Sequence, residues 1–73
     1  MNIEYLDYFC KVALAGSISK AAKEAHISQS ALSQQILKLE EILGCKLLER
    51  SNKGVELTEK GLIVLKYADN IIR

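Results

Sequence analysis

Two helix-forming segments follow each other in this chain with only a short break between them, and this arrangement constrains the fold more than any other feature. Ser17 precedes an alanine-rich segment at residues 18–25, and Ser28 precedes a longer segment at residues 29–43, which ends at Gly44. A serine side chain accepts hydrogen bonds from the free N–H groups at a helix start, and glycine favours the left-handed conformation just beyond a helix end. The sequence therefore predicts a helix, a tight turn and a second helix.

The longer segment has an apolar face that predicts a packed core. Its large aliphatic residues recur at steps of four, three and four, so they fall within a narrow stripe of an α-helix. The stripe consists of Leu32, Ile36, Leu39 and Leu43. In the shorter segment, Ala21, Ala22 and Ala25 favour helix and leave room for another helix to approach closely.

Further elements are predicted on both sides of this pair. Residues 2–15 carry apolar side chains at helical spacing, with Asn2 as the candidate N-cap. At residues 46–57, two short segments surround a turn rich in Asn and Gly, which is typical of a two-stranded hairpin. Thr58 then caps a last helical segment at residues 59–73. The expected architecture is mainly α, with a three-helix bundle, a two-stranded hairpin and a final helix.

The composition is that of one small folded domain. The chain has 73 residues, of which 49% are hydrophobic and 26% are charged, and it has no proline. These values predict a globular helical protein with a modest core, and they exclude a disordered tail. The formal net charge is only +1, so any affinity for nucleic acid has to come from the placement of Lys and Arg.

Residues that would carry catalysis or hold a metal ion are sparse. Cys10 and Cys45 lie far apart in apolar neighbourhoods, and His26 is the single histidine. The favoured interpretation is that both cysteines are small buried hydrophobes in a reducing compartment, and a metal or disulfide pair is the alternative. The sequence carries no nucleophile–base pair, paired carboxylates or glycine-rich phosphate loop. We therefore expect no enzymatic activity, no metal and no cofactor.

The two ends of the chain bear on its location and its extent. The amino terminus lacks the basic region and apolar run of a signal peptide, and no apolar stretch approaches the roughly 18 residues that cross a bilayer. The prediction is a cytoplasmic protein without a membrane segment. The last helical segment has no cap or stop signal, which predicts that the natural chain continues.

The face of the longer helix opposite its apolar stripe is polar, and it carries no acid near its amino end. This face consists of Ser30, Ser33 and Gln34 and, one turn further on, Leu37 and Lys38. A glutamine amide pairs bidentately with adenine, and a serine hydroxyl contacts bases or phosphates. A second helix of this kind, joined to the first by a tight turn, enters the major groove of DNA. The alternative is a plain helical hairpin in a small bundle.

Taken in order, the motifs of this chain resemble the DNA-binding domain of LysR-type bacterial transcription regulators. The resemblance is highly specific as an ensemble and spans essentially the whole chain. It implies a three-helix bundle with a two-stranded wing, followed by a long linker helix that pairs with its counterpart in a dimer. The matching segments are Gly16-Ser17-Ile18-Ser19, Ala21-Ala22, residues 27–36, Leu39-Glu40, Leu43-Gly44, residues 47–50 and residues 57–61.

Three positions depart from the family pattern. Ser30 stands where the family usually has proline, Gln34 where arginine is common, and Leu48 where phenylalanine is frequent. Ser30 costs some preorganisation of the helix start but supplies a hydroxyl and an N–H group. Gln34 replaces a preference for guanine with one compatible with adenine, so the DNA sequence preference is where the resemblance carries over least.

The resemblance places the DNA contacts on the second helix of the pair and on the wing. The second helix is expected to contribute Ser28, Gln29, Ser30, Ser33, Gln34 and Lys38. Arg50 and Lys53 flank the hairpin turn, where positive charge meets phosphate or the minor groove. Without the resemblance, a merely solvated turn would be the favoured interpretation. Thr58 is a helix cap first, and a phosphate contact at the N–H groups beside it is left open.

The resemblance also divides the chain. Residues 1–58 are expected to form the winged helix-turn-helix domain, with the helix-turn-helix at about residues 18–37, and residues 59–73 to begin the linker helix of a homodimer. The apolar residues of this last helix cover more than one stripe, which requires a partner. The predicted dimer contacts are Leu62, Leu65 and Ile72. A tetramer is left open for the full-length protein, and a small-molecule effector is expected only through a missing carboxy-terminal domain.

Two classes of function fit this scaffold. The favoured one is sequence-specific binding of a double-stranded DNA operator, with residues 29–43 as the recognition helix in the major groove. The alternative is a winged-helix module that binds another protein through its apolar last helix. Acidic residues on the face of Ser30, Ser33 and Gln34 would favour the alternative, and none is present there.

Overall fold

A computed structural model of the chain describes residues 3–52 and 54–72, and for residues 69, 71 and 72 it describes the backbone alone. Helices α1 (Ile3–Ala15), α2 (Ile18–Ala25) and α3 (Gln29–Leu43) are followed by strands β1 (Leu48–Ser51) and β2 (Gly54–Leu57) and by helix α4 (Glu59–Ile72). All predicted elements are present in the predicted order. The expected cap at Asn2 lies outside the described residues.

Hydroxyl side chains cap α2, α3 and α4 as the sequence predicted. Ser17 Oγ accepts the N–H of Lys20 at 3.2 Å, and Ser28 Oγ accepts the N–H of Ala31 at 3.0 Å. The hydroxyl of Thr58 accepts an N–H of α4 in the same way. These bonds satisfy donors that have no partner inside the helix, so each helix starts where its cap lies.

The turn between α2 and α3 is built on a histidine in the left-handed conformation. His26 has φ 60° and ψ 39°. Its N–H donates to the Lys23 carbonyl at 3.3 Å, and the next N–H, of Ile27, donates to the Ala22 carbonyl at 3.0 Å. This pair of bonds ends a helix in a position that glycine usually occupies. The sequence predicts the turn but not the left-handed conformation of His26.

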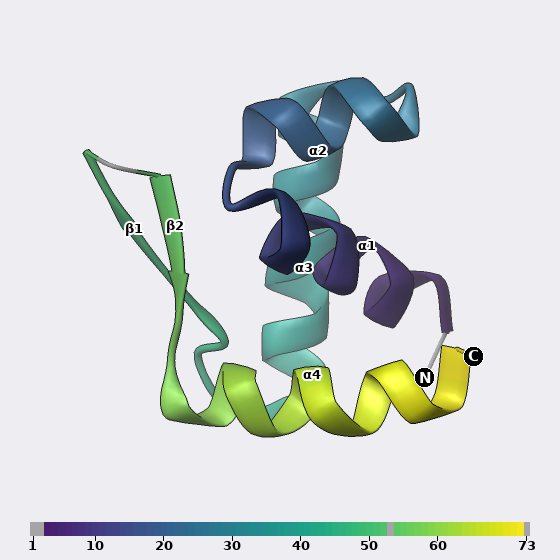
Figure 1. The fold of residues 1–73 in the computed structure, drawn as a ribbon, viewed down its shortest axis with the longest axis vertical. Coiled ribbons are helices and arrows are strands. Elements are labelled where there is room, and N and C mark those ends of the chain that lie inside the picture. Colours follow the sequence, from purple (N-terminus) through teal and green to yellow (C-terminus); the bar gives the residue numbers. More distant parts are fainter. Residues whose placement is uncertain (1–2, 53, 73) are drawn as a thin grey trace.

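The core lies where α1 crosses the other helices. Phe9, Val12, Leu32, Leu39 and Leu47 are the largest fully buried side chains. Helix α1 packs against α2, α3 and α4, with α4 crossing below the others in Figure 1. Burying these side chains is the main favourable contribution to folding in a domain of this size.

One residue predicted to lie in the core, Leu43, does not lie there. Leu32, Ile36 and Leu39 are buried, but Leu43 is 38% exposed. Leu43 belongs to the last turn of α3, just before Gly44, and among the described residues the buried stripe of α3 ends at Leu39. Helical periodicity placed Leu43 on the correct side of the helix, but it does not reveal where the neighbouring helices stop covering that side.

The two strands form an antiparallel hairpin held against the helices. Leu48 pairs with Leu57 and Arg50 pairs with Val55, and the hairpin stands to one side of the helical body in Figure 1. The Val55 N–H donates to the Gly16 carbonyl at 3.2 Å, which fastens β2 to the turn between α1 and α2. The hairpin is therefore fixed relative to the helix pair.

Candidate nucleic-acid interface

The amino-terminal half of α3 presents a polar face to solvent. Gln29, Ser30 and Gln34 are exposed, Ser33 is half-buried, and Lys38 follows one turn on as an exposed cation. The first turn of α3 holds no acidic residue. Such a face offers amide and hydroxyl groups for hydrogen bonding without carboxylates that would repel phosphate.

Arg50 joins the wing to this face. Its Nη2 donates to the hydroxyl oxygen of Ser33 at 3.2 Å, although the two residues are 17 positions apart. The sequence predicts Arg50 beside the hairpin turn; in the structure it lies within β1 opposite Val55 and turns toward α3. Lys53, the other predicted wing cation, lies outside the described residues.

Glu40 holds the start of β1 against α3, a role that the sequence does not predict. Its Oε2 accepts the N–H of Leu47 at 2.7 Å and that of Leu48 at 3.3 Å. Glu40 appeared only as part of a family motif, and no local pattern signals a bond across seven or eight residues. A carboxylate that accepts two N–H groups makes stronger bonds than a neutral acceptor does.

Thr58 is fully engaged in holding the end of the wing. Its hydroxyl donates to the Lys46 carbonyl at 2.7 Å and accepts the Gly61 N–H at 2.9 Å. The Thr58 N–H donates to the Leu47 carbonyl at 3.0 Å. The predicted cap is confirmed, and the same residue ties the entrance of β1 to the start of α4.

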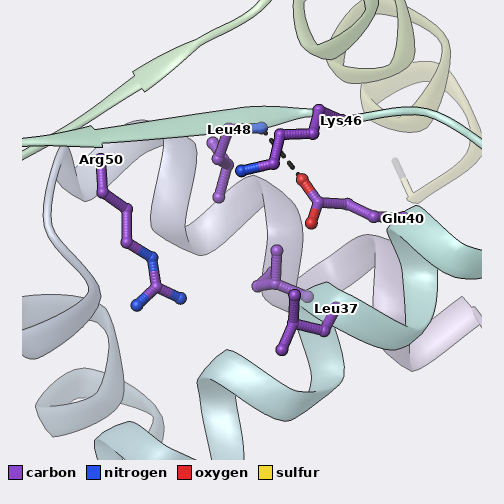
Figure 2. Close-up of a pocket in the computed structure, with 6 residues that line it drawn as sticks. Leu37, Glu40, Lys46, Leu48 and Arg50 are labelled. Atoms are coloured by element: carbon purple, nitrogen blue, oxygen red, sulfur yellow. Dashed lines mark hydrogen bonds between the residues drawn. The ribbon is translucent and has the colours of Figure 1, made fainter.

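A pocket of about 400 Å³ separates α3 from β1. It is lined by Ile36, Leu37, Glu40, Lys46, Leu48 and Arg50. In Figure 2 the Arg50 side chain reaches from β1 toward α3, and Glu40 meets the wing at the other end of the pocket beside Lys46. A second pocket of about 300 Å³ lies at the turn between α2 and α3, beside Lys23, Ser28 and Gln29. Both pockets flank the polar face of α3.

Helix α4 exposes apolar side chains away from this face. Leu62 is 57% exposed, Ile63 is 52% exposed and Tyr67 is 64% exposed. Of the predicted dimer contacts, Leu62 lies on this surface, Leu65 is half-buried against the domain's own core, and the side chain of Ile72 is outside the described part. Ile63 and Tyr67 are exposed although they are not among the predicted contacts, because helical spacing alone does not reveal which apolar residues the domain covers.

Other kinds of site find little support in the part of the chain that the structure describes. No three His, Cys, Asp or Glu side chains gather there as a metal site requires. Cys10 and Cys45 are both half-buried. No described helix is both long and apolar enough to span a bilayer.

The fold is that of a winged helix-turn-helix domain, as predicted, with α2 and α3 as the helix pair and the hairpin as the wing. Residues 3–62 match the family described as bacterial regulatory helix-turn-helix proteins of the lysR family. The chain belongs to this family.

Curated relatives and solved structures agree with this assignment. The chain is 46% identical over 72 residues to the HTH-type transcriptional regulator TfdT of Cupriavidus pinatubonensis, covering 99% of this chain and 32% of TfdT. It is 44% identical over 73 residues to the nitrogen assimilation regulatory protein Nac of Klebsiella aerogenes, covering 100% of this chain and 24% of Nac. The chain thus spans a third or less of these relatives.

The solved structures to which the chain is similar include DNA-binding domains bound to DNA. The complex of the CbnR DNA-binding domain superposes with a TM-score of 0.94 at 44% identity, covering 99% of this chain and 83% of that one. The complex of the BenM DNA-binding domain with catB site 1 DNA gives a TM-score of 0.94 at 40% identity, covering 99% and 81%.

Proposed function

We propose that this chain is the amino-terminal, operator-reading domain of a LysR-family transcription regulator, and that it binds double-stranded DNA sequence-specifically with α3 in the major groove. One observation carries the proposal: the exposed start of α3 displays Gln29, Ser30 and Gln34 with no acid beside them, and Arg50 joins them from the wing. The DNA complexes of the CbnR and BenM domains support it.

The chemistry of this face divides the contacts into two kinds. Gln29 and Gln34 carry amides that suit the adenine edge in the major groove. Ser28, Ser30 and Ser33 suit phosphates or bases, and Lys38 and Arg50 suit phosphates. With a net charge of only +1, these few cations supply the nonspecific affinity. Lys53 remains a predicted phosphate contact, and a contact at the N–H groups beside Thr58 stays open.

We further propose that residues 59–73 begin a linker helix through which two protomers pair. The exposed Leu62, Ile63 and Tyr67 support this, since several large apolar side chains exposed on one helix of a small domain are typical of an interface. Residues 1–58 then form the DNA-reading unit. Effector binding belongs to a further domain outside this chain, and the whole protein regulates transcription in the cytoplasm and catalyses no reaction.

A selection from random duplex DNA tests the proposal. The domain retains duplexes over several rounds, the survivors are sequenced, and the affinity of the enriched duplex is compared with that of a scrambled one at two salt concentrations. We expect a shared motif, tighter binding to the enriched duplex and an affinity that falls with salt. Equal binding to both duplexes, or no enrichment, would contradict sequence-specific recognition.

A further inference from the structure

The Glu40 side chain of α3 binds the backbone at the entrance of the wing. Its negative charge is unfavourable for a direct contact with DNA phosphates. Its Oε2 accepts the N–H groups of both Leu47 and Leu48, at the point where the chain enters β1. These two bonds occupy one oxygen of a half-buried carboxylate. Glu40 is thus placed to act on DNA binding only through the strand that it holds.

The spacing of residues on α3 matches that on β1. Ser33 and Glu40 are seven residues apart, so they lie on the same side of α3 with about 10 Å between them along the axis. Three residue steps in extended conformation, from Leu47 to Arg50, also cover about 10 Å. The chain is therefore fastened to α3 at two points, at Leu47 just before β1 by Glu40 and at Arg50 within β1 by Ser33.

The two fastenings differ in strength and exposure. The Glu40 bonds are half-buried and charge-assisted, and the shorter measures 2.7 Å. The Arg50–Ser33 bond measures 3.2 Å and is exposed, and exposed contacts of this kind hold little by themselves. Of these two contacts with α3, the bonds at Glu40 therefore contribute more to the position of Arg50.

We propose that Glu40 is a positioning residue for DNA binding, which sets where Arg50 meets the duplex by fixing the start of β1 on the recognition helix. The inference rests on the proposed function. Removal of the carboxylate leaves two backbone N–H groups without their acceptor. The start of β1 is then no longer held at its position along α3. Arg50 stays in the chain but loses its place beside Ser33.

The test separates this role from a simple change of charge. Glu41 is an exposed acid next to Glu40 on the same helix, so Glu41→Ala removes the same charge without touching the wing. Glu40→Gln removes the charge and keeps an oxygen that accepts the same N–H groups. Affinities are measured on the enriched duplex, at a temperature where circular dichroism shows every variant folded.

We expect Glu41→Ala and Glu40→Gln to bind DNA as tightly as the wild type or slightly more tightly, since each removes a negative charge. Glu40→Ala should bind at least about fivefold more weakly than Glu41→Ala. In an Arg50→Ala background the same Glu40→Ala change should cost less than about twofold, because Arg50 is no longer there to be misplaced. Equal affinities of Glu40→Ala and Glu41→Ala, or an undiminished loss in the Arg50→Ala background, would overturn the inference.

A measurement without DNA gives an independent check. In nuclear Overhauser spectra of the free domain, contacts between Arg50 and Ser33 should be present in the wild type and Glu40→Gln, and lost in Glu40→Ala. Their survival in Glu40→Ala would overturn the inference even if the wild type binds its operator. A wild type that binds no duplex overturns the proposed function, and the inference with it.

Discussion

Gly61 of α4 lies directly against the carbonyl oxygen of Leu47, so closely that a Cβ at position 61 would overlap that oxygen. The same carbonyl accepts the Thr58 N–H at 3.0 Å, so moving it away would weaken that hydrogen bond. Helix α4 and the entrance of the wing therefore touch backbone to backbone.

We predict that Gly61→Ala destabilises the domain by about 1 to 3 kcal/mol, although alanine is the better helix former by about 1 kcal/mol. The overlap with the Leu47 carbonyl outweighs the better helix propensity, so the net effect is destabilising. Thermal unfolding followed by circular dichroism measures this change in stability. Asn70→Ala, at an exposed position of the same helix, should leave the melting temperature unchanged or raise it. Gly61→Ala melting at or above the wild-type temperature would contradict the close contact.

Replacing His26 by glycine should stabilise the domain. His26 holds φ 60° at the end of α2, a conformation that costs a non-glycine residue about 1 to 2 kcal/mol and that glycine adopts freely. After the greater flexibility of glycine in the unfolded state is subtracted, we expect a gain of about 0.5 to 1 kcal/mol in urea unfolding. His26→Ala keeps the strain and should bring no gain. Equal stability of both variants would count against strain at this turn.

Glu49 and Glu56 form a like-charge pair directly across the hairpin. Both side chains are exposed, and such a pair costs a hairpin about 0.2 to 1 kcal/mol. Either Glu49→Gln or Glu56→Gln should raise the free energy of unfolding at low salt. The double variant should gain little more than one single variant, because one change already removes the repulsion. Strictly additive gains, or gains that persist at high salt, would point to another cause.

Association of the domain should depend on the exposed apolar face of α4. We expect wild-type sedimentation to show a dimer forming at high micromolar concentration without DNA, and Leu62→Glu or Ile63→Glu to abolish it. Leu37→Glu is the matched control, since Leu37 is 56% exposed on α3 and Leu62 is 57% exposed on α4. A strictly monomeric wild type, or loss of the dimer in the control, would contradict pairing through α4.

The sequence predicted best those features that depend on neighbouring residues. The hydroxyls of Ser17, Ser28 and Thr58 each accept an N–H group three residues further along the chain. Such local contacts can be predicted from the sequence. The helix pair, the hairpin and the polar start of α3 follow from such local signals. The resemblance to LysR-type regulators added the interpretation of the hairpin as a wing and of the last helix as the start of a dimer linker.

Contacts between residues far apart in the sequence could not be predicted from it. The bond from Arg50 to Ser33 spans 17 residues, and the bond from the Leu47 N–H to Glu40 spans seven. Neither separation has a periodic signature, because each depends on how the strand is laid on the helix. Leu43 was wrongly placed in the core for a related reason, since amphipathic spacing indicates a side of a helix and not how far its cover extends.

The central claim is that α3 reads base edges through Gln29 and Gln34, both exposed at its start. The most direct measurement is the affinity of Gln29→Ala and Gln34→Ala for the enriched duplex, for its single-position substitutions and for a scrambled duplex. We expect at least one variant to lose about 1 to 3 kcal/mol on the enriched duplex and to lose its preference at one position, with scrambled binding almost unchanged.

Lys53→Ala serves as the contrasting variant, and its role stays a prediction from the sequence. It should weaken binding to both duplexes alike and lower the salt slope by about one unit if Lys53 neutralises one phosphate. If both glutamine variants instead lose the same affinity on the enriched and scrambled duplexes, with every positional preference intact, direct readout by this face of α3 is contradicted.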